Sequence, residues 1–458
     1  MPSIAHQSGS LLTGLAIAGL VASACSSTAS PSASRSGSAA PSVTASPSSA
    51  ASPSSLPSSP AASDAWLVVG TAGRDGLEVI LASTHEKDYD LPLGVPDATW
   101  GHLVVATADG TDTRVQALVV QPGFDGASQS VPGAWRLPTI GADPIPTGVS
   151  ADGSTIVLVP ALADGAAASS SSAAKASRFA IVTRTFDRAA RVISLPGAFE
   201  YDAISPDGTT LYVVEHLPAP PVAHYQVRAV DVANGRLRDG VVVEKANLDE
   251  AMGGYPIAQV HAEGGMVFTL YRGAEHPFIH ALNTIDGWAL CIDLPATGAD
   301  SDSAALEWGL APTSDHKRLV AVNATLGVAA EISVGDLAVS RTKTFSPTAA
   351  TRITLAKFGH QLTGPAGRRV VIASDGHMVY AAGANGIVRL SGDDLGVTGW
   401  LASGTAIDAL AVTPDGRTIY ALTRSDGRIL MIDAATGVAL GEVQGSGYDR
   451  LVAIVPAS

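Results

Sequence analysis

The sequence predicts an all-β fold built from one repeated, four-stranded unit, and two observations carry this prediction. From Ala65 onward, runs of four to eight residues rich in Val, Ile, Leu and Tyr are separated by Gly, Asp, Asn and Pro, which is typical of strands and tight turns. No long stretch with the 3.6-residue period of a helix interrupts them. The same order of strands and turns then recurs along the chain, which indicates a repeat architecture.

The repeat is clearest in residues 406–444. A first strand leads into a Pro-Asp-Gly turn at Pro414–Gly416, and strands follow at Thr418–Leu422, Arg428–Asp433 and Val438–Gln444. Four antiparallel strands joined by tight turns form one blade of a β-propeller. Related units begin near residues 66, 100, 148, 201, 255, 305, 368 and 406.

The spacing of the units gives the number of blades. Eight units average about 49 residues and seven would average about 56, and both values lie near known blade periods. We therefore predict eight blades, with seven as the alternative. The first unit lacks an innermost strand, whereas Leu451–Val455 forms a strand that is left over. We expect this C-terminal strand to complete the first blade and close the ring, which would remove exposed sheet edges.

Asp-Gly pairs recur in the turns between strands, for example at Asp152, Asp207 and Asp375. Their spacing fits neither a calcium loop nor a sialidase repeat. We interpret them as structural, because an Asp carboxylate can accept hydrogen bonds from nearby backbone N–H groups while Gly adopts the positive φ.

Residues 65–458 resemble the YVTN-type and quinoprotein-like repeats of bacterial extracytoplasmic β-propellers. Residues 201–295 are also similar to a group of bacterial secreted propeller proteins, through segments such as YDAISPDGTTLYVVEHL and ALCIDLP. The resemblance implies the fold and an extracytoplasmic location. It implies no single activity, because propellers serve as enzymes, receptors and scaffolds.

The N-terminal segment predicts export and anchoring. Residues 11–24 are apolar and uncharged, and as a helix they would extend only ~21 Å, too short for a bilayer, which indicates a signal peptide over residues 1–24. The residues Ala22 to Cys25 resemble a bacterial lipobox, which implies lipidation of Cys25 and attachment to the extracytoplasmic face of the cell membrane. The alternatives are an ordinary signal cut after Ala24 or Ala29, which would release a secreted protein, and a retained anchor.

A linker of biased composition follows Cys25. Of residues 26–64, 17 are Ser, nine are Ala and six are Pro, and none is aromatic. Such a segment buries too little apolar surface to offset the entropy of ordering. We predict a disordered tether at residues 25–64 and a propeller at residues 65–458.

The composition also excludes some partners. The 42 acidic and 28 basic side chains give a net charge of -14, whereas a surface that binds nucleic acid needs an excess of Lys and Arg. We therefore expect no nucleic-acid partner, and we expect a monomer.

No motif for a familiar reaction is present. The sequence lacks Gly-x-Ser-x-Gly and His-Glu-x-x-His. His276 and His280 are four residues apart, but in extended chain this spacing is ~13 Å, too far to share one metal ion. Cys291 is interpreted as a small buried apolar residue. We predict no catalytic residue, metal site or cofactor.

Polar residues are nevertheless concentrated in one part of the chain. Five of the 11 histidines fall within residues 216–280. Strand ends of neighbouring blades meet at one face of a propeller, so these residues could form a pocket for a small ligand or a protein partner. The alternative is a set of locally polar loops. The candidate binding residues are Glu215, His216, His224, Tyr225, Arg228, Tyr255, His261, Tyr271, Arg272, His276 and His280.

These observations predict an extracytoplasmic, lipid-anchored protein whose propeller is a ligand-binding or protein-interaction module. The alternative is an extracytoplasmic propeller enzyme, either a lactonase-like hydrolase or a quinoprotein-like dehydrogenase. We favour the binding module, because no set of ligands or catalytic residues can be identified in the sequence.

Overall fold

A computed structural model describes residues 65–456, apart from 75, 98–99, 121–125, 141–145, 162–175, 218–223, 243–251, 274–275, 296–303, 305–306, 348–366, 374–375 and 446. The predicted signal peptide, Cys25 and the predicted tether lie outside the described residues. Strands dominate the described part, and a 3₁₀ turn at Glu263–Gly265 joins two of them. Among these residues, no helix has the length and apolar character needed to cross a membrane.

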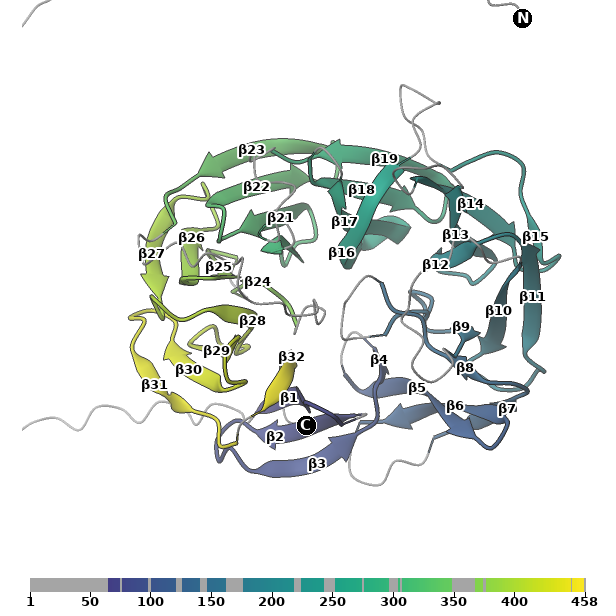
Figure 1. The fold of residues 1–458 in the computed structure, drawn as a ribbon, viewed down its shortest axis with the longest axis horizontal. Helices are drawn as coiled ribbons and strands as arrows, with labels where there is room; N and C mark the ends of the chain where they lie inside the picture. Colours follow the sequence, from purple (N-terminus) through teal and green to yellow (C-terminus); the bar gives the residue numbers. More distant parts are fainter. Residues whose placement is uncertain are drawn as a thin grey trace, which may run out of the picture. The chain divides into compact units, whose positions relative to one another are not determined.

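The strands form eight four-stranded antiparallel blades, as predicted (Figure 1). The strands of each blade are given from the innermost outward. Blade 1 consists of β32 (Tyr448–Pro456), β1 (Ala65–Thr71), β2 (Leu77–Leu81) and β3 (Lys87–Leu91), and blade 2 of β4 (Gly94–Pro96), β5 (His102–Asp109), β6 (Asp112–Val119) and β7 (Ser128–Val131). Blade 3 consists of β8 (Trp135–Arg136), β9 (Thr155–Pro160), β10 (Ala176–Thr183) and β11 (Arg191–Pro196), and blade 4 of β12 (Phe199–Ile204), β13 (Thr210–Leu217), β14 (His224–Asp231) and β15 (Arg236–Leu237).

Blades 5 to 8 follow the same order. Blade 5 consists of β16 (Met252–Ala262), β17 (Met266–Gly273), β18 (Phe278–Asn283) and β19 (Trp288–Asp293), and blade 6 of β20 (Gly309–Pro312), β21 (Arg318–Asn323), β22 (Val328–Ser333) and β23 (Ala338–Thr344). Blade 7 consists of β24 (Val370–Ile372), β25 (Met378–Gly383), β26 (Gly386–Ser391) and β27 (Val397–Leu401), and blade 8 of β28 (Ile407–Val412), β29 (Thr418–Thr423), β30 (Ile429–Asp433) and β31 (Ala439–Glu442). Blades 4 and 5 are joined into one sheet by two residue pairs between β14 and β16.

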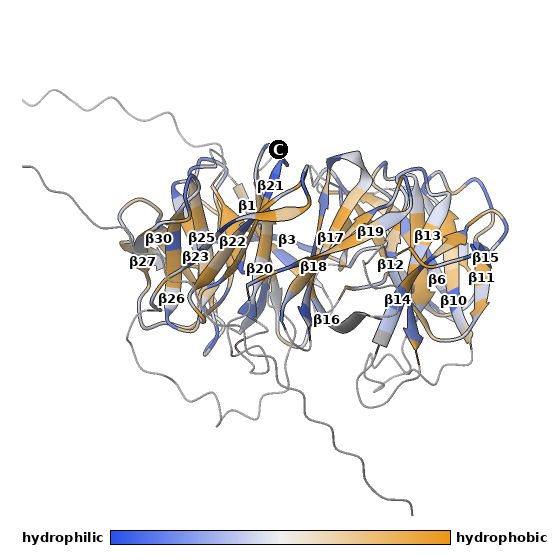
Figure 2. Ribbon diagram, turned by 90° about the horizontal axis from the view of Figure 1, so that it is seen from above, coloured by the Kyte–Doolittle hydropathy of each residue, from blue (hydrophilic) through white to orange (hydrophobic). Residues whose placement is uncertain are grey.

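The hydrophobic core is divided among the spaces between blades. Each neighbouring pair of blades shares a cluster of buried apolar side chains, including the pair formed by blades 8 and 1. Because a middle strand is covered on both faces, β18 is buried along its whole length, whereas the outermost strand β31 is exposed. Figure 2 shows the apolar residues along the strands and hydrophilic residues at their ends.

The C-terminal strand closes the ring, as the sequence predicts. β32 pairs with β1 in antiparallel register, from Ala65 opposite Pro456 to Thr71 opposite Tyr448. The Arg450 Nη2 group donates a further hydrogen bond to the carbonyl oxygen of Arg74, 376 residues away, at 3.1 Å. Blade 1 therefore combines the first described strand with the last one (Figure 1).

The two ends of the blades differ in their connections. At the end that we call the turn face, tight turns join each innermost strand to the second strand, as at residues 205–209 and 413–417. At the opposite end, the connection face, the chain enters each new innermost strand, and the second strand turns into the third. Residues just before β20, β24 and β28, or just after β21, β25 and β29, therefore lie at the connection face.

The turn-face turns confirm the structural interpretation of Asp152 and Asp207, whereas Asp375 lies outside the described residues. In the turn of blade 4, the Ser205 hydroxyl donates to Asp207 Oδ1 at 2.7 Å, and the same oxygen accepts the backbone N–H of Thr209 at 3.0 Å. Gly208 has a φ of 69°, and the Ser205 oxygen accepts the backbone N–H of Thr210. Blades 3, 6 and 8 repeat this pattern of bonds from Ser or Thr to Asp.

Candidate functional site

The predicted binding residues lie on blades 4 and 5, and most of them are near the connection face. His261 is an exception, because it lies near the other end of β16 and is exposed. Arg228 lies in the middle of β14, and Arg272 near the end of β17 is half-buried. His224 is the first residue of β14, and Tyr255 lies near the start of β16. Their side chains lie outside the described part.

Several of these residues form separate ion pairs rather than one pocket. Glu215 Oε2 accepts hydrogen bonds from Arg228 Nη1 at 2.8 Å and from Gln226. His276 Nε2 is 2.9 Å from Asp293 Oδ1 on the outermost strand of blade 5. His216 Nε2 is 3.2 Å from Glu200 Oε2 on the innermost strand of blade 4.

Three other predicted residues meet in the layer between blades 4 and 5. The Tyr271 ring stacks on Tyr225, with ring centroids 5.4 Å apart, and on Phe278 at 5.1 Å. His280 meets the edge of the same Tyr271 ring at 6.4 Å and is fully buried. Tyr225, Tyr271 and Phe278 belong to the buried cluster of this layer, a packing that neither the predicted pocket nor the alternative of locally polar loops described.

The same layer contains a buried carboxyl group that sequence reasoning missed. Asp202 on β12 is 2% exposed, and burial raises its pKa to about 7. Burial also lowers the pKa of His280 to about 4, and neither of its ring nitrogens has a hydrogen-bond partner among the described residues. Gln259 donates hydrogen bonds to the Asp202 carbonyl and to Thr269. Cys291, which we interpreted as a small buried apolar residue, packs against this layer and is partly buried.

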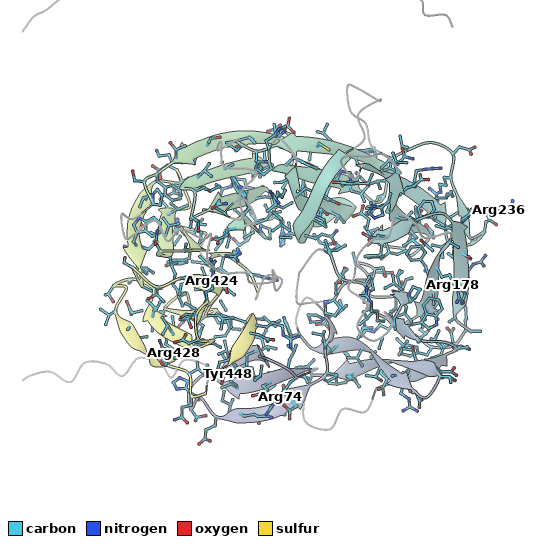
Figure 3. The ribbon with its side chains drawn as sticks, viewed as in Figure 1. Arg74, Arg178, Arg236, Arg424, Arg428 and Tyr448 are labelled. Atoms are coloured by element: carbon cyan, nitrogen blue, oxygen red, sulfur yellow. The ribbon has the colours of Figure 1, made fainter. Side chains whose placement is uncertain are left out.

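A second polar group lies at the inner ends of blades 6 to 8, on the connection face. It consists of four charged side chains that we call the inner network. Glu307 precedes β20, Arg369 precedes β24, Asp408 is in β28 and Arg424 follows β29. Figure 3 labels Arg424 on the inner side of blade 8.

The inner network joins three successive blades. Arg424 donates from Nη1 to Glu307 Oε1 at 2.8 Å and from Nε to Asp408 Oδ1 at 2.7 Å. Arg369 Nη2 is 3.5 Å from the same Asp408 oxygen, and its Nη1 is 4.0 Å from Glu307 Oε2. The Thr325 hydroxyl donates to Glu307 Oε2 and in turn accepts the backbone N–H of Ala384 at 2.9 Å, which adds a link to blade 7.

Charge pairing outweighs burial at Glu307 and Arg424, but not at Arg369. Burial opposes ionisation of Glu307, but Arg369 and Arg424 outweigh it and lower the pKa of the carboxyl group. Burial likewise opposes the charge on Arg424, but Glu307 and Asp408 raise its pKa. Burial lowers the pKa of Arg369, although Glu307 and Asp408 favour its charged form. Each charge therefore depends on its partners on neighbouring blades.

The inner network is incompletely satisfied. Arg369 Nη1 and Arg424 Nη2 are buried and have no hydrogen-bond acceptor among the residues that the structure describes. An unsatisfied buried donor is costly, so such groups normally bind water or a ligand. The side chains of Asp408 and Arg424 are 23% and 28% exposed, so solutes can approach this group.

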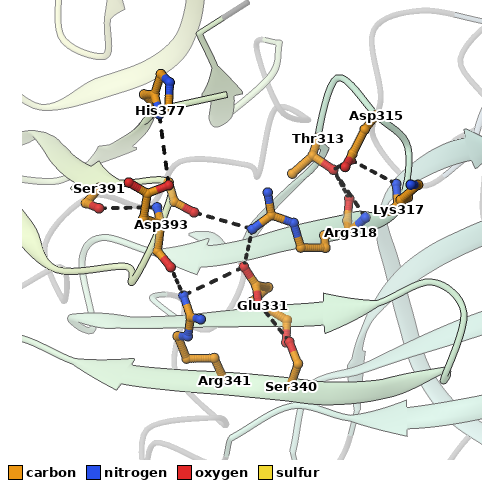
Figure 4. A network of polar contacts seen from close by, with 11 residues as sticks. Thr313, Asp315, Lys317, Arg318, Glu331, Ser340, Arg341, His377, Ser391 and Asp393 are labelled. Atoms are coloured by element: carbon orange, nitrogen blue, oxygen red, sulfur yellow. Dashed lines mark hydrogen bonds and ion pairs between the residues drawn. The ribbon is translucent and has the colours of Figure 1, made fainter. Parts of the chain in front are cut away.

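A third network, between blades 6 and 7, shows how the chain satisfies such charges elsewhere (Figure 4). Glu331 accepts a hydrogen bond from Arg318 at 2.9 Å and another from Ser340 at 2.9 Å. Arg341 lies 4.0 Å from Glu331 and donates to the carbonyl oxygen of Asp393. No nitrogen of Arg318 or Arg341 is among the buried donors that lack an acceptor. Its charged side chains pair within blade 6 and with blade 7, and we interpret this network as structural.

The described surface also has an open polar hollow of about 530 Å³ at the turn between β14 and β15. Asp231, Asn234, Arg236, Leu237 and Arg238 line it. Three of its polar residues already have partners: Asn234 binds Asp231, and Arg238 binds Thr210. Within the described ranges, no three His, Cys, Asp or Glu side chains are arranged to hold a metal ion.

Comparisons with known proteins give a fold likeness. No family model matches the chain, and no curated protein matches it. Apo AztD from Citrobacter koseri is 12% identical, covers 87% of this chain and 99% of its own, and has a TM-score of 0.49. The dihydro-heme d1 dehydrogenase NirN, in complex with DHE, is 13% identical over 88% of this chain and 77% of its own, with a TM-score of 0.49.

The C-terminal WD40 domain of Sif2 is 11% identical over 80% of this chain and 87% of its own, with a TM-score of 0.40. At these identities and scores, the comparisons carry no argument about activity or ligand. The assignment of the fold rests on the blades, the register of their strands and the closed ring, and the chain is an eight-bladed β-propeller.

Proposed function

We propose that the chain is an extracytoplasmic lipoprotein, anchored to the cell membrane through Cys25, whose propeller is a ligand-binding module. One observation carries the binding role. Charged side chains from three blades converge at the inner end of the connection face, and Asp408 and Arg424 remain partly exposed there. A propeller holds such groups in fixed positions, because each blade is packed between two neighbours.

The location is supported by the sequence of residues 1–64. A diacylglyceryl group together with an N-acyl chain would meet the requirement of two hydrophobic signals for stable anchoring. Cell fractionation tests this proposal. The wild-type protein should sediment with membranes, and Cys25→Ser should move it to the soluble fraction.

Cys291→Ser is the matched control, because Cys291 lies within blade 5 and is not next to the signal segment. It should leave the protein in the membrane fraction. A wild-type protein that is already soluble after fractionation would contradict the anchor.

Binding is tested by the melting temperature of the full chain with and without the low-molecular-mass fraction of the growth medium. Compounds that bind the folded state raise the melting temperature. The increase should be lost in Arg424→Lys, which disrupts the inner network. It should persist in Arg428→Lys, because Arg428 lies on the same blade but pairs with exposed Asp426 and Glu442.

An equal increase in both variants, or none in the wild type, would contradict a binding site at the inner network. The same experiment separates the binding module from an enzyme. An enzyme would consume the stabilising compound, so the increase would decay on incubation with the wild-type protein, whereas a binding module leaves it constant.

A further inference from the structure

We propose that the inner network binds a small oxyanion, a carboxylate or a phosphate, through Arg369 and Arg424. This inference rests on the proposed function, because it names the ligand chemistry of the same site. It starts from the two buried nitrogens, Arg369 Nη1 and Arg424 Nη2, that lack an acceptor among the described residues.

The two buried nitrogens without an acceptor determine the chemistry of the ligand. A guanidinium group only donates hydrogen bonds, so its partner must offer acceptor oxygens. Both oxygens of Glu307 already accept: Oε1 from Arg424, and Oε2 from Thr325. Asp408 Oδ1 accepts from Arg424 and faces Arg369. These three oxygens already have partners, and neither remaining donor has an acceptor within hydrogen-bond distance among the described residues, so an oxygen from outside the network would satisfy them.

The local charge permits an anion to bind. Two arginines face two carboxylates in the inner network, so its charges balance and it carries no net negative charge, in a chain whose net charge is -14. Carboxylates and phosphates form the strongest hydrogen bonds to arginine, because both partners are charged and the oxygens match the guanidinium fork.

The site is covered but close to solvent. The two nitrogens are buried, although the Arg424 side chain as a whole is 28% exposed, so a ligand reaches them only if Arg424 moves. The network around Glu331 has no buried donor of this kind and is not expected to bind an anion.

Equilibrium binding to the full chain tests this inference, with inorganic phosphate and oxalate as separate probes at constant ionic strength in chloride. The wild-type protein should bind at least one probe saturably, and the preferred probe distinguishes a phosphate site from a carboxylate site. Arg369→Lys and Arg424→Lys should each weaken binding about 10-fold or more, because a lysine offers no fork. Arg428→Lys should bind like the wild type.

A wild-type protein that binds neither probe saturably would overturn the oxyanion site. Binding that is equal in the wild type and in both lysine variants would also overturn it. In either case the melting experiment with the medium fraction still tests the proposed function. Stabilisation that depends on Arg424 in that experiment would show a binding site for another ligand.

A second measurement does not depend on the folding of variants. Crystals of the wild-type full chain grown with selenate should show anomalous selenium density within hydrogen-bond distance of Arg369 and Arg424. If the wild-type protein binds phosphate in solution, selenium density only at other arginines would overturn the assignment.

Discussion

Asp202 and His280 are buried in the same interblade layer, and their burial has opposite consequences for the pH dependence of stability. In the folded state Asp202 stays protonated up to its pKa of about 7, compared with a pKa of 3.8 in the unfolded chain. Its contribution to the free energy of unfolding therefore decreases as pH rises between these two values. In the folded state His280 stays unprotonated down to its pKa of about 4, compared with a pKa of 6.5 in the unfolded chain. Its contribution to the free energy of unfolding therefore decreases as pH falls from 6.5 to 4.

We expect the two effects to cancel between about pH 4 and pH 6.5. Each shift corresponds to roughly 3 to 4 kcal/mol, since one pKa unit is about 1.4 kcal/mol. In Asp202→Asn, the free energy of unfolding should fall as pH is lowered from 6.5 to 4. In His280→Gln it should fall as pH rises from 4 to 7. Urea unfolding across this range measures both slopes relative to the wild type.

Thr111→Val is the control, because Thr111 is exposed and has no titratable group. Its pH profile should parallel that of the wild type. Variants of Asp202 and His280 whose profiles also parallel the wild type would show that neither group titrates as its burial requires.

At the scale of single elements, the turns at the turn face depend on one hydroxyl group. In blade 8, the Thr413 hydroxyl donates to Asp415 at 2.6 Å and accepts the backbone N–H of Thr418 at 3.0 Å. Thr413→Val keeps the shape of the side chain but removes both bonds, and we expect a loss of about 1 to 2 kcal/mol in unfolding free energy.

Denaturant unfolding checks this value. Thr111→Val is the control, because Thr111 is exposed and has only a 3.3 Å contact with the neighbouring Asp112. It should change stability by less than about 0.5 kcal/mol. A Thr413→Val variant as stable as this control would show that the turn forms without the hydroxyl.

These elements also show what a sequence can and cannot predict. The blades were predictable because strand and turn patterns are local and recur, and the turn at Pro414–Gly416 carries its own signature. The inner network was not predictable, because Glu307 and Arg424 are 117 residues apart and no motif connects them. The only local signal is that Asp408 and Arg424 are charged residues at the ends of otherwise apolar strands. The candidate residues on blades 4 and 5 were predicted as a group, but chemistry alone could not indicate that Tyr225, Tyr271 and His280 point into the core.

At the scale of the whole molecule, the ring depends on β32. Removing residues 449–458 exposes the edge of β1 and the partners of Leu451, Val452 and Val455, which are buried. Each fully buried apolar side chain contributes about 1.5 to 3 kcal/mol, so we expect this truncation to aggregate or to fail to fold. Thermal melts and light scattering measure the outcome.

Removing only residues 457–458 is the control, because β32 ends at Pro456. This shorter truncation should melt like the full chain. A truncation at residue 448 that stays monomeric and melts at the same temperature would contradict closure by β32.

The pairing of β1 with β32 also determines the order of folding during synthesis. β1 emerges early and β32 emerges after every other described strand, so an incomplete chain contains a first blade without its inner strand. Leu67 and Leu422 are part of the core between blades 1 and 8. Until β32 is added, this core stays open. Such distant pairings form slowly, because loop entropy must be overcome before the contact is made. Ring closure is therefore a late event that follows synthesis, and in the meantime the nascent chain presents an open strand edge to the chaperones and proteases around it.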